Sequence, residues 1–388
     1  MMAPSQAVLS RLEKLIGFPT VSRDSNLGLI EWVRDELGRL GVQCRLSYDD
    51  ERRKANLFAT IGAPGAGGLV LSGHTDVVPV DGQDWRTDPF RAVIADERVY
   101  GRGSADMKGF IAVVLAALPG MLARKSDRPI HIALSYDEEL GCLGAPRLID
   151  DFRAAGIQPA RCVVGEPTSM RLVNGHKGGI VHRCRVQGRA AHSALAPQGV
   201  NAISYAALLV AQLREIAQRL ENTETPDAGY DVPHTTLNVG TISGGIASNI
   251  VAASCEFRFD IRYLPHTSPQ SIVDELQQAA GELLVEMRAI APEAAITFER
   301  VGGILPLATD AKAPIVGEVS RLLGGAQAPT KVGFGTEAGL FDAAGISTVI
   351  CGPGSIAQAH KPNEFVTLEQ LALCERFVQA LVEESACH

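Results

Sequence analysis

The sequence predicts an α/β protein: a three-layer domain with a mostly parallel sheet, interrupted by a smaller α+β domain with an antiparallel sheet and two helices. In residues 1–178 and again in 303–388, short β-rich apolar runs alternate with segments of helical periodicity, which is typical of a parallel sheet covered on both faces. In residues 179–302, apolar and polar residues alternate along the strands, as in an antiparallel sheet with one exposed face. We therefore expect one discontinuous domain and one inserted domain.

Helices in the first domain are predicted where apolar residues recur every three or four positions, and strands where short apolar runs end in glycine or polar residues. The predicted helices are 5–17, 28–40, 311–323 and one from about 367. The predicted strands are 42–48, 55–61, 69–74, 130–136, 161–166 and 347–351. Residues just past the carboxyl ends of such strands line the ligand crevice of an open α/β sheet, so a functional site is expected there.

The inserted domain is predicted from strands that alternate apolar and polar residues and from two long helical segments. Its strands are 181–188, 235–243 and 254–263, and its helices are 201–220 and 268–289. Residues 221–234 are predicted to form a polar loop.

Charge and composition exclude two classes of partner. The 388 residues carry a formal net charge of −8, and no basic cluster is dense enough to follow a phosphate backbone, so no nucleic acid is expected. The longest apolar stretch, FIAVVLAAL at 110–118, is too short to span a membrane, and the N-terminus lacks the apolar region of a signal peptide. The eight cysteines form no CxxC pair, which favours a soluble, cytoplasmic protein whose thiols take no part in a site.

Potential metal ligands follow the predicted strand ends and one glycine-rich loop. They are His74, Asp76, Asp106, Glu138, Glu139, Glu166 and His360. Each residue alone would usually be a solvated loop residue. Together, several carboxylates in one crevice would repel one another unless cations lay between them. Two histidines with several carboxylates favour zinc, or cobalt or manganese, over magnesium, and the surplus of ligands favours a two-metal centre.

Two pairs of close neighbours suggest separate roles. Adjacent residues at a strand end point in different directions, so Glu139 can bind a metal while Glu138 faces a bridging water and takes its proton. Asp76, two residues past His74, is placed to orient that imidazole from behind the metal.

The chain resembles the dinuclear zinc amidohydrolases, a family that includes acetylornithine deacetylase, succinyl-diaminopimelate desuccinylase, aminoacylases and the glutamate-releasing carboxypeptidases. The resemblance spans nearly the whole chain. It rests on SGHTDVVP, GRGSADMKG, DEE, GEPT, GRAAHSA, ASNIV, FDIRYLP, GFGTEA and GPGSIAQAHKPNE, which occur in family order. It implies that the larger domain is catalytic and that the inserted domain is a lid or dimerisation domain, so a homodimer is expected.

The resemblance also implies a ligand set for two divalent ions. One ion would be bound by His74, Asp106 and Glu166. The other would be bound by Asp106, Glu139 and His360. Asp106 would therefore bridge the two ions, for which zinc is favoured and cobalt is the alternative.

The remaining roles come from the same resemblance. Glu138 would be the general base that generates a metal-bridging hydroxide, and His192 would donate to the tetrahedral intermediate in the partner subunit's site. The substrate would be held by Lys177, Asn249, Arg262, Gly335 and Thr336, with Asn249 also supplied by the partner. The residues alone leave simpler interpretations open: His192 as a loop histidine, Arg262 paired with Asp260, and Lys177 as a charged residue at the domain junction.

Within the family, HKGGIVH, GFGTEA and GPGSIAQAHKPNEFV resemble acetylornithine deacetylases more than desuccinylases. The resemblance implies a small-molecule N-acyl amino acid as substrate and hydrolysis of N2-acetyl-L-ornithine to L-ornithine and acetate, a step of arginine biosynthesis. We expect Glu337 to recognise the side-chain ammonium. The alternatives are a desuccinylase or broad aminoacylase, a non-catalytic protein that binds a metal or amino acid, and an assembly module.

Overall fold

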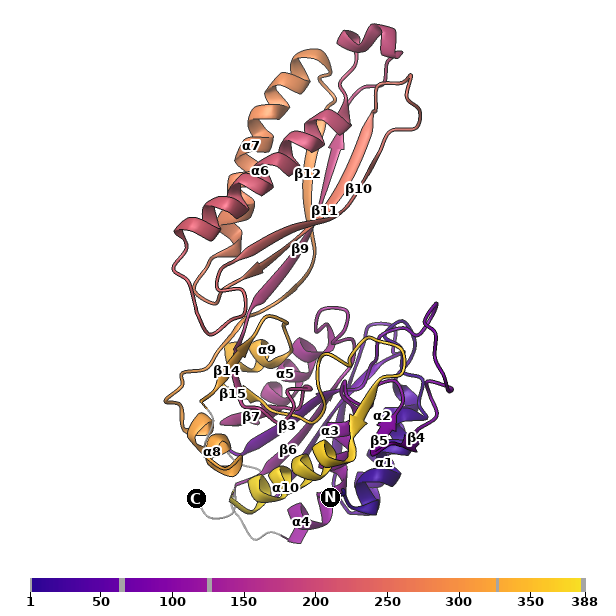
Figure 1. Cartoon of the computed structure of the whole chain (residues 1–388), viewed down its shortest axis with the longest axis vertical. Coiled ribbons are helices and arrows are strands. Elements are labelled where there is room, and N and C mark those ends of the chain that lie inside the picture. The colour runs from indigo at the N-terminus through magenta and orange to yellow at the C-terminus, as the bar shows by residue number, and fades with distance from the viewer. Residues whose placement is uncertain (1, 63–66, 124–127, 326–327, 385–388) are drawn as a thin grey trace. The chain divides into compact units, whose positions relative to one another are not determined.

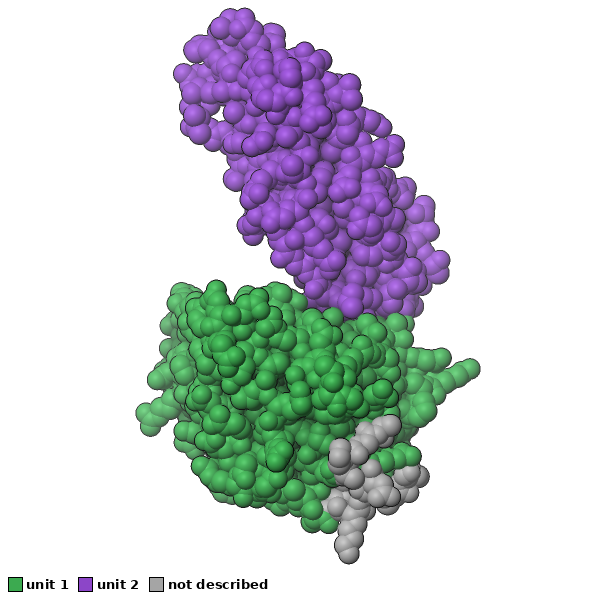
Figure 2. Space-filling view, turned by 180° about the vertical axis from the view of Figure 1, so that it is seen from behind, with its two compact units in different colours: residues 1–175, 307–331, 336–388 green, residues 176–306, 332–335 purple. Residues whose placement is uncertain are grey.

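The computed structural model of the chain describes residues 2–62, 67–123, 128–325 and 328–384. The chain divides into two compact units (Figure 2). Unit 1 comprises residues 1–175, 307–331 and 336–388, and unit 2 comprises residues 176–306 and 332–335. The domain boundaries expected from the sequence, 178/179 and 302/303, stay predictions, and residues 332–335 group with unit 2.

Unit 1 is built on a nine-stranded mixed sheet (Figure 1). Its strands are β1 (Cys44–Tyr48), β2 (Ala55–Ile61), β3 (Leu69–His74), β6 (Ile130–Ser135), β7 (Arg161–Val164), β8 (Val173–His176), β13 (Leu307–Ala308), β14 (Thr330–Val332) and β15 (Ser347–Ile350). Their order is β1-β2-β6-β3-β7-β15-β8-β13, with β14 paired to β8. The central strands β6, β3, β7 and β15 run parallel to one another. The predicted parallel sheet is confirmed at its centre, while β1, β2 and β8 make antiparallel pairs beside it.

Helices cover both faces of this sheet. On one face, α1 (Gln6–Ile16) and α10 (Leu368–Glu384) pack on α3 (Lys108–Ala116), which packs on β3. Leu57 and Ala59 of β2 join the apolar core on that face. Phe58 lies between them and stacks on Phe152 of α5 (Gly144–Ala154), because successive strand residues point to opposite faces. The remaining helices of unit 1 are α2 (Leu27–Arg39), α4 (Leu118–Ala123), α8 (Pro314–Leu322) and α9 (Ala338–Ala343).

The local sequence accounts for these elements. The Ser5 hydroxyl caps α1 by accepting from the N–H of Val8, and Val8, Leu12 and Leu15 recur at helical spacing on the buried side. The strands β3 and β6 are buried along their whole length, which is why their sequences are mostly apolar. The Asp, Glu, Lys and Arg residues of this part of the chain therefore lie outside these two strands.

Unit 2 is a four-stranded antiparallel sheet with two long helices. Its strands are β9 (Gly178–Gln187), β10 (Thr236–Gly244), β11 (Ser254–Tyr263) and β12 (Ala295–Ile304), in the order β10-β11-β9-β12. The helices α6 (Ala202–Thr223) and α7 (Pro269–Ile290) pack together against the sheet, and a short 3-10 helix spans Ser193–Gln198. The strand β12 was not predicted, because Gly302 and Gly303 interrupt its alternation and its register shifts there.

A small third sheet in unit 1 lies beside the glycine-rich loop at 101–106. It consists of β4 (Val93–Ala95), β5 (Arg98–Tyr100) and β16 (Phe365–Thr367), in the order β16-β5-β4. Pairing of β16 with β5 brings the segment after His360 next to the segment before the glycine-rich loop at 101–106. Among the described residues, none of the helices combines the length and hydropathy needed to cross a bilayer.

Candidate metal centre

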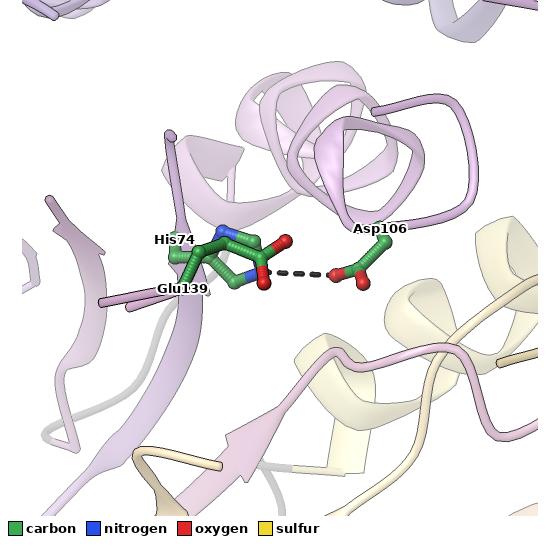
Figure 3. Close-up of side chains that lie close together, drawn as sticks. All are labelled: His74, Asp106 and Glu139. Carbon is green, nitrogen blue, oxygen red and sulfur yellow. Dashed lines mark hydrogen bonds and ion pairs between the residues drawn. The ribbon is translucent and has the colours of Figure 1, made fainter. Parts of the chain in front are cut away.

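The predicted ligands lie at the carboxyl ends of three adjacent parallel strands. His74 is the last residue of β3, Glu138 and Glu139 follow β6, and Glu166 follows β7. Because β6, β3 and β7 are neighbours that run in the same direction, their ends meet at one edge of the sheet. Asp106 reaches this edge from the loop before α3 and faces His74 (Figure 3).

His74 is held with one ring nitrogen facing the site. The side chain is buried, and Nδ1 lies 2.9 Å from the backbone oxygen of Asp76. The other nitrogen, Nε2, lies 3.0 Å from Oδ1 of Asp106 and 3.8 Å from Oε1 of Glu166. A carbonyl oxygen can only accept a hydrogen bond, so Nδ1 carries a proton. Burial opposes the charged form of the ring, but hydrogen bonds to Asp106 and Asp76 raise the pKa of His74 well above its usual value. A metal ion would take the place of the proton on Nε2.

Asp106 faces a second histidine with its other oxygen. Nε2 of His360 lies 3.3 Å from Oδ2 of Asp106 and 3.1 Å from Oε2 of Glu139. One carboxylate therefore lies between two imidazoles, His74 and His360, with one oxygen toward each. This is the geometry required of a ligand that bridges two ions.

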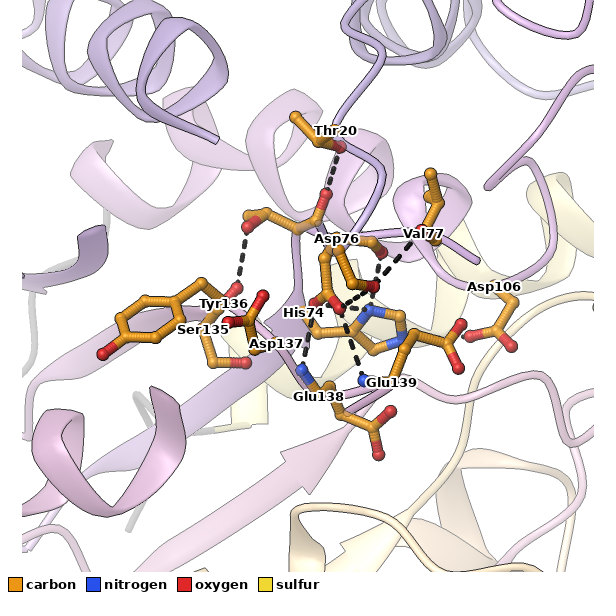
Figure 4. A network of polar contacts seen from close by, with 12 residues as sticks. Thr20, His74, Asp76, Val77, Asp106, Ser135, Tyr136, Asp137, Glu138 and Glu139 are labelled. Carbon is orange, nitrogen blue, oxygen red and sulfur yellow. Dashed lines mark hydrogen bonds and ion pairs between the residues drawn. The ribbon is translucent and has the colours of Figure 1, made fainter. Parts of the chain in front are cut away.

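The side chain of Asp76 fixes the peptide units behind the ligands (Figure 4). Its Oδ1 accepts from the N–H of Glu138 at 3.0 Å. Its Oδ2 accepts from the Ser22 hydroxyl at 2.7 Å and from the N–H of Glu139 at 3.3 Å. The carboxylate also lies 3.6 Å from Nδ1 of His74. Asp76 thus orients His74 mainly through the backbone oxygen of Asp76. Its carboxylate also positions Glu138 and Glu139, a role that the sequence did not predict.

The ligand atoms are spaced for divalent ions. Those of His74, Asp106 and Glu139 lie within 4.8 Å of one another, as do those of His74, Glu138 and Glu166. Tetrahedral zinc ligands about 2.0–2.2 Å from the ion lie about 3.4 Å apart, which agrees with the 3.0 Å and 3.8 Å separations around His74. Among the described residues, one buried oxygen each of Glu139 and Glu166 has no hydrogen-bond donor. A cation would supply the partner that these oxygens lack.

The same crowding changes the protonation of the site. Burial and the charges of neighbouring acids raise the pKa of Glu138 and that of Glu166 well above the usual value, and also raise the pKa of Glu139. Hydrogen bonds to Asp106 and Glu139 raise the pKa of His360 to about 10. The chain alone therefore holds protons in this crevice, and divalent ions would displace them.

Glu138 and Glu139 meet different partners although they are adjacent. Glu139 reaches His360, whereas Oε1 of Glu138 accepts from the thiol of Cys142 at 3.5 Å. Glu138 is therefore left outside the contacts that join Asp106 to the histidines. The expectation that no thiol enters the site is wrong, because the buried Cys142 contacts the candidate base.

Comparison with known proteins assigns the family. The sequence pattern of peptidase family M20/M25/M40 matches residues 70–384. The chain belongs to this family. An acetylornithine deacetylase of Pasteurella multocida (strain Pm70) is 35% identical over 378 residues, covering 93% of this chain and 93% of that protein. Another, of Proteus mirabilis (strain HI4320), is 34% identical over 380 residues, covering 95% of this chain and 94% of that protein.

Solved structures of the M20 family share the fold. The M20 family metallo-carboxypeptidase Sso-CP2 of Sulfolobus solfataricus has a TM-score of 0.76 at 18% identity, covering 99% of this chain and 100% of that one. The YXEP protein of Bacillus subtilis, described as a dinuclear metal binding peptidase from the M20 family, has a TM-score of 0.69 at 12% identity, covering 98% of this chain and 97% of that one. Together with the sequence match, they make this M20 protein a metal-dependent amide hydrolase.

Glu337 of this M20 enzyme has both carboxylate oxygens bound to hydroxyl groups of the protein. It is fully buried at the start of α9, and its two oxygens accept from the hydroxyls of Ser72 and Ser135, each at 2.6 Å. Ser72 lies on β3 and Ser135 ends β6, so the carboxylate joins these strands beneath the metal ligands. The predicted contact with a substrate ammonium does not fit this position, because both oxygens are already bound and solvent does not reach them.

Two predicted substrate ligands in unit 2 make local contacts. Lys177 is buried, and its ammonium donates to the backbone oxygen of His234 at 2.6 Å. Arg262 donates to Asp260 at 2.8 Å, which is the simpler of the two interpretations open from the sequence. Neither contact uses all the N–H donors of its side chain, so these contacts do not by themselves exclude a substrate.

The two residues expected to act in a partner's site lie together on an exposed part of unit 2. The N–H of Ser193 donates to the backbone oxygen of Asn249 at 3.0 Å, and His192 forms a β-bridge with Ile250. The side chains of His192 and Asn249 are both exposed. His192 accepts from the N–H of Ala194 at its Nδ1, which leaves its Nε2 free to donate a hydrogen bond outward.

The predicted turn at 335–336 has a structural role. A Cβ added to Gly335 would lie 2.9 Å from the Ile304 side chain, so only glycine fits without a shift. The hydroxyl of the buried Thr336 accepts from the N–H of Ala338 at the start of α9. The sequence analysis also missed Glu364 of the HKPNE motif, whose carboxylate contacts the loop that carries Asp106; its place four residues after a predicted ligand was the available signal.

Proposed function

We propose that the chain deacetylates N2-acetyl-L-ornithine, releasing L-ornithine and acetate for arginine synthesis, with two divalent ions that are zinc, or cobalt as the alternative. The observation that carries the hydrolytic part is the position of Asp106 between His74 and His360, with Glu138 beside this arrangement but outside it. The choice of substrate is supported by the relatives named acetylornithine deacetylase.

The residues present fit both ions. His74, Asp106 and Glu166 would hold one ion, and Asp106, Glu139 and His360 would hold the other. When bound, such ions polarise an amide carbonyl and lower the pKa of water. The hydrogen bond from Nδ1 of His74 to a backbone oxygen already directs Nε2 toward the ion.

Glu138 would carry the proton during hydrolysis. It would accept a proton from the attacking water and return it to the amine nitrogen as the carbon–nitrogen bond breaks. A raised pKa suits both tasks, since a carboxyl group that titrates nearer the working pH both accepts and donates effectively. Asp76 holds the N–H of Glu138, and burial keeps bulk water from competing for this proton. A hydrogen bond from His192 of a partner subunit would stabilise the oxyanion.

The position of Glu337 favours one further candidate, a deacylase that accepts several N-acyl amino acids. That residue was the argument from the sequence for ornithine in particular, and it is held by Ser72 and Ser135 instead. Arg262 would still suit the α-carboxylate that all these substrates share, because its planar fork matches two oxygens.

One set of assays tests the proposal. The purified protein is analysed for bound metal and then assayed with acetylornithine, succinyl-diaminopimelate and simple acetylated amino acids, before and after chelation. We expect preference for acetylornithine, loss of hydrolysis on chelation, and recovery on addition of zinc or cobalt. Hydrolysis of all acetylated amino acids at similar kcat/KM would favour the broad deacylase. Metal binding without hydrolysis of any substrate would contradict both.

A further inference from the structure

Glu364 is a buried carboxylate that binds the loop carrying Asp106. It is 1% exposed, and its two oxygens accept four hydrogen bonds. Oε1 accepts from the backbone N–H groups of Ala105 at 2.9 Å and Asp106 at 3.1 Å. Oε2 accepts from the N–H of Gly103 at 3.0 Å and from the Arg102 guanidinium at 2.7 Å. Both oxygens of the Glu364 carboxylate therefore bind groups of the loop at 102–106 and hold its backbone in place.

Arg102 joins the same carboxylate to the segment that carries His360. It is also 1% exposed, and its Nη1 lies 3.3 Å from the backbone oxygen of Lys361. Its Nη2 donates to the side-chain oxygen of Gln83 at 2.6 Å, and Gln83 donates in turn to the backbone oxygen of His360 at 3.0 Å. One network therefore fixes the backbone on both sides of the contact between Asp106 and His360.

The two histidines depend on this network to different degrees. His74 is buried at the end of a central strand, and a backbone oxygen fixes its ring. The His360 side chain is 53% exposed, its backbone has a φ of 63°, and its ring contacts Asp106 and Glu139. Its placement therefore rests on the loop that holds it rather than on packing around the ring.

We propose that Glu364, with Arg102, is a positioning residue for the ion that Asp106, Glu139 and His360 would hold. Removing its charge would loosen the two loop-borne ligands, Asp106 and His360, while the strand-borne ligands of the other ion stay in place. The inference rests on the proposed two-metal centre. It assigns a function to the last residue of the HKPNE motif, which binds no metal itself.

Glu364→Gln tests this with little change in volume. A glutamine amide has one acceptor oxygen, so its NH2 group must face either the N–H groups of Ala105 and Asp106 or those of Arg102 and Gly103. Both sides present donors, so two of the four hydrogen bonds are lost and the Arg102 charge is left without its carboxylate.

The measurement is zinc bound per chain after dialysis against buffered zinc, together with calorimetric titration of the metal-free protein with zinc. The unchanged protein should bind two ions. In E364Q we expect affinity for the ion held by Asp106, Glu139 and His360 to fall about 10- to 100-fold, the effect typical of losing an outer hydrogen-bond partner. Affinity for the other ion should fall by less, because it shares only Asp106 and keeps His74 and Glu166. Circular dichroism confirms that each variant is folded.

Glu318→Gln is a matched control. Glu318 is 9% exposed and pairs with Arg161, the first residue of β7, so it lies at the opposite end of that strand from the ligands. E318Q also removes the negative charge of a largely buried pair, but it should keep both ions.

Gln83→Ala is a second variant in case E364Q does not fold. Gln83 is only partly buried, and its removal cuts the link to His360 without removing the Glu364 charge. We expect the affinity for the same ion to fall, but by less than in E364Q. The inference would be overturned if a folded E364Q bound both ions as tightly as the unchanged protein does. If E364Q fails to fold, the same result in Q83A would overturn it. Fewer than two ions in the unchanged protein would instead overturn the two-metal centre on which it rests.

Discussion

Glu138 and Glu139 are neighbours in the chain whose carboxylates contact different groups. Asp76 accepts from both of their N–H groups, and this fixed backbone sends one side chain to His360 and the other to Cys142. Two adjacent acids would otherwise repel one another without benefit. Their separation allows one to bind a metal while the other stays available for proton transfer.

Glu138→Gln should lower kcat for acetylornithine about 10²- to 10⁴-fold, which is the usual contribution of a general base. Zinc content should be unchanged, because Glu138 lies outside the proposed ligand sets. Glu139→Gln is the comparison, and it should lose zinc as well as activity. Measured kcat together with zinc per chain separates the two roles. Full activity of E138Q would remove Glu138 from the mechanism.

Zinc affinity should rise with pH, because metal-free chains hold protons at the ligands. The pKa of His360 is raised to about 10 by Asp106 and Glu139. The protonated pair therefore stabilises the metal-free fold fully below about pH 6.5, the unfolded value, and this contribution is lost as pH rises through about 10. Zinc must displace that proton at neutral pH.

Calorimetric titration with zinc in buffers of different ionisation enthalpy measures this proton release. At pH 8 we expect protons to leave on binding of the His360-side ion, and fewer to leave in His360→Asn. Apparent affinity should increase between pH 6.5 and 10. An affinity independent of pH would contradict the protonated state proposed for the metal-free site.

At the scale of secondary structure, the elements with strong patterns were predictable. The apolar run at 69–74 and the helical periodicity at 5–17 correspond to β3 and α1. The strand β3 is buried on both faces, which gives a short apolar run, and α1 is buried on the side that its period dictates. The ligands His74 and Glu166 followed from the ends of such strands. The strand β12 was missed because two glycines break its alternation, and the short strands β4, β5 and β16 are too brief to show a period.

Other parts of the site could not be predicted because tertiary contacts decide them. Glu337 follows a turn with a plausible binding sequence, yet its carboxylate points into the protein and joins Ser72 of β3 to Ser135 of β6. Cys142 lies between two glycines in the stretch LGCLG, and only the fold brings its thiol to Glu138. The local periodicity of the sequence does not predict where either side chain points.

Glu337→Gln tests the structural role of that carboxylate between two strands. Because hydrogen bonds to a buried acid contribute about 1.5–3 kcal/mol, we expect a lower free energy of unfolding in urea. The ratio of KM for acetylornithine to KM for an uncharged N-acetyl amino acid should stay unchanged. A selective rise in KM for acetylornithine would restore the substrate-binding role expected from the sequence.

At the scale of the whole molecule, unit 2 carries a group of exposed apolar side chains near its β10–β11 connection. Ile242 is 53% exposed and Ile246 is 87% exposed. Asn249 lies in the same connection, and His192 forms a β-bridge with Ile250 beside it; both side chains are exposed. Large exposed apolar side chains at one place mark interaction surfaces. They support the predicted homodimer through the inserted domain.

Ile246→Asp should therefore shift the protein from dimer to monomer, as measured by light scattering during size-exclusion chromatography. Val285→Asp on α7 is the matched control, because Val285 is 73% exposed and lies on a helix away from that connection. If His192 acts across the interface, the monomer should also lose most of its activity. A monomeric unchanged protein would contradict the expected assembly.

The ligands are spread along the chain from His74 to His360, with the whole of unit 2 between Glu166 and His360. During synthesis the ribosome must therefore release almost the entire polypeptide before the last histidine becomes available. Until then a nascent chain presents several acids and one imidazole, which hold a metal ion weakly. Full metal loading would thus report that translation has passed His360, and a product terminated before that residue would be recognisable by its poor retention of zinc.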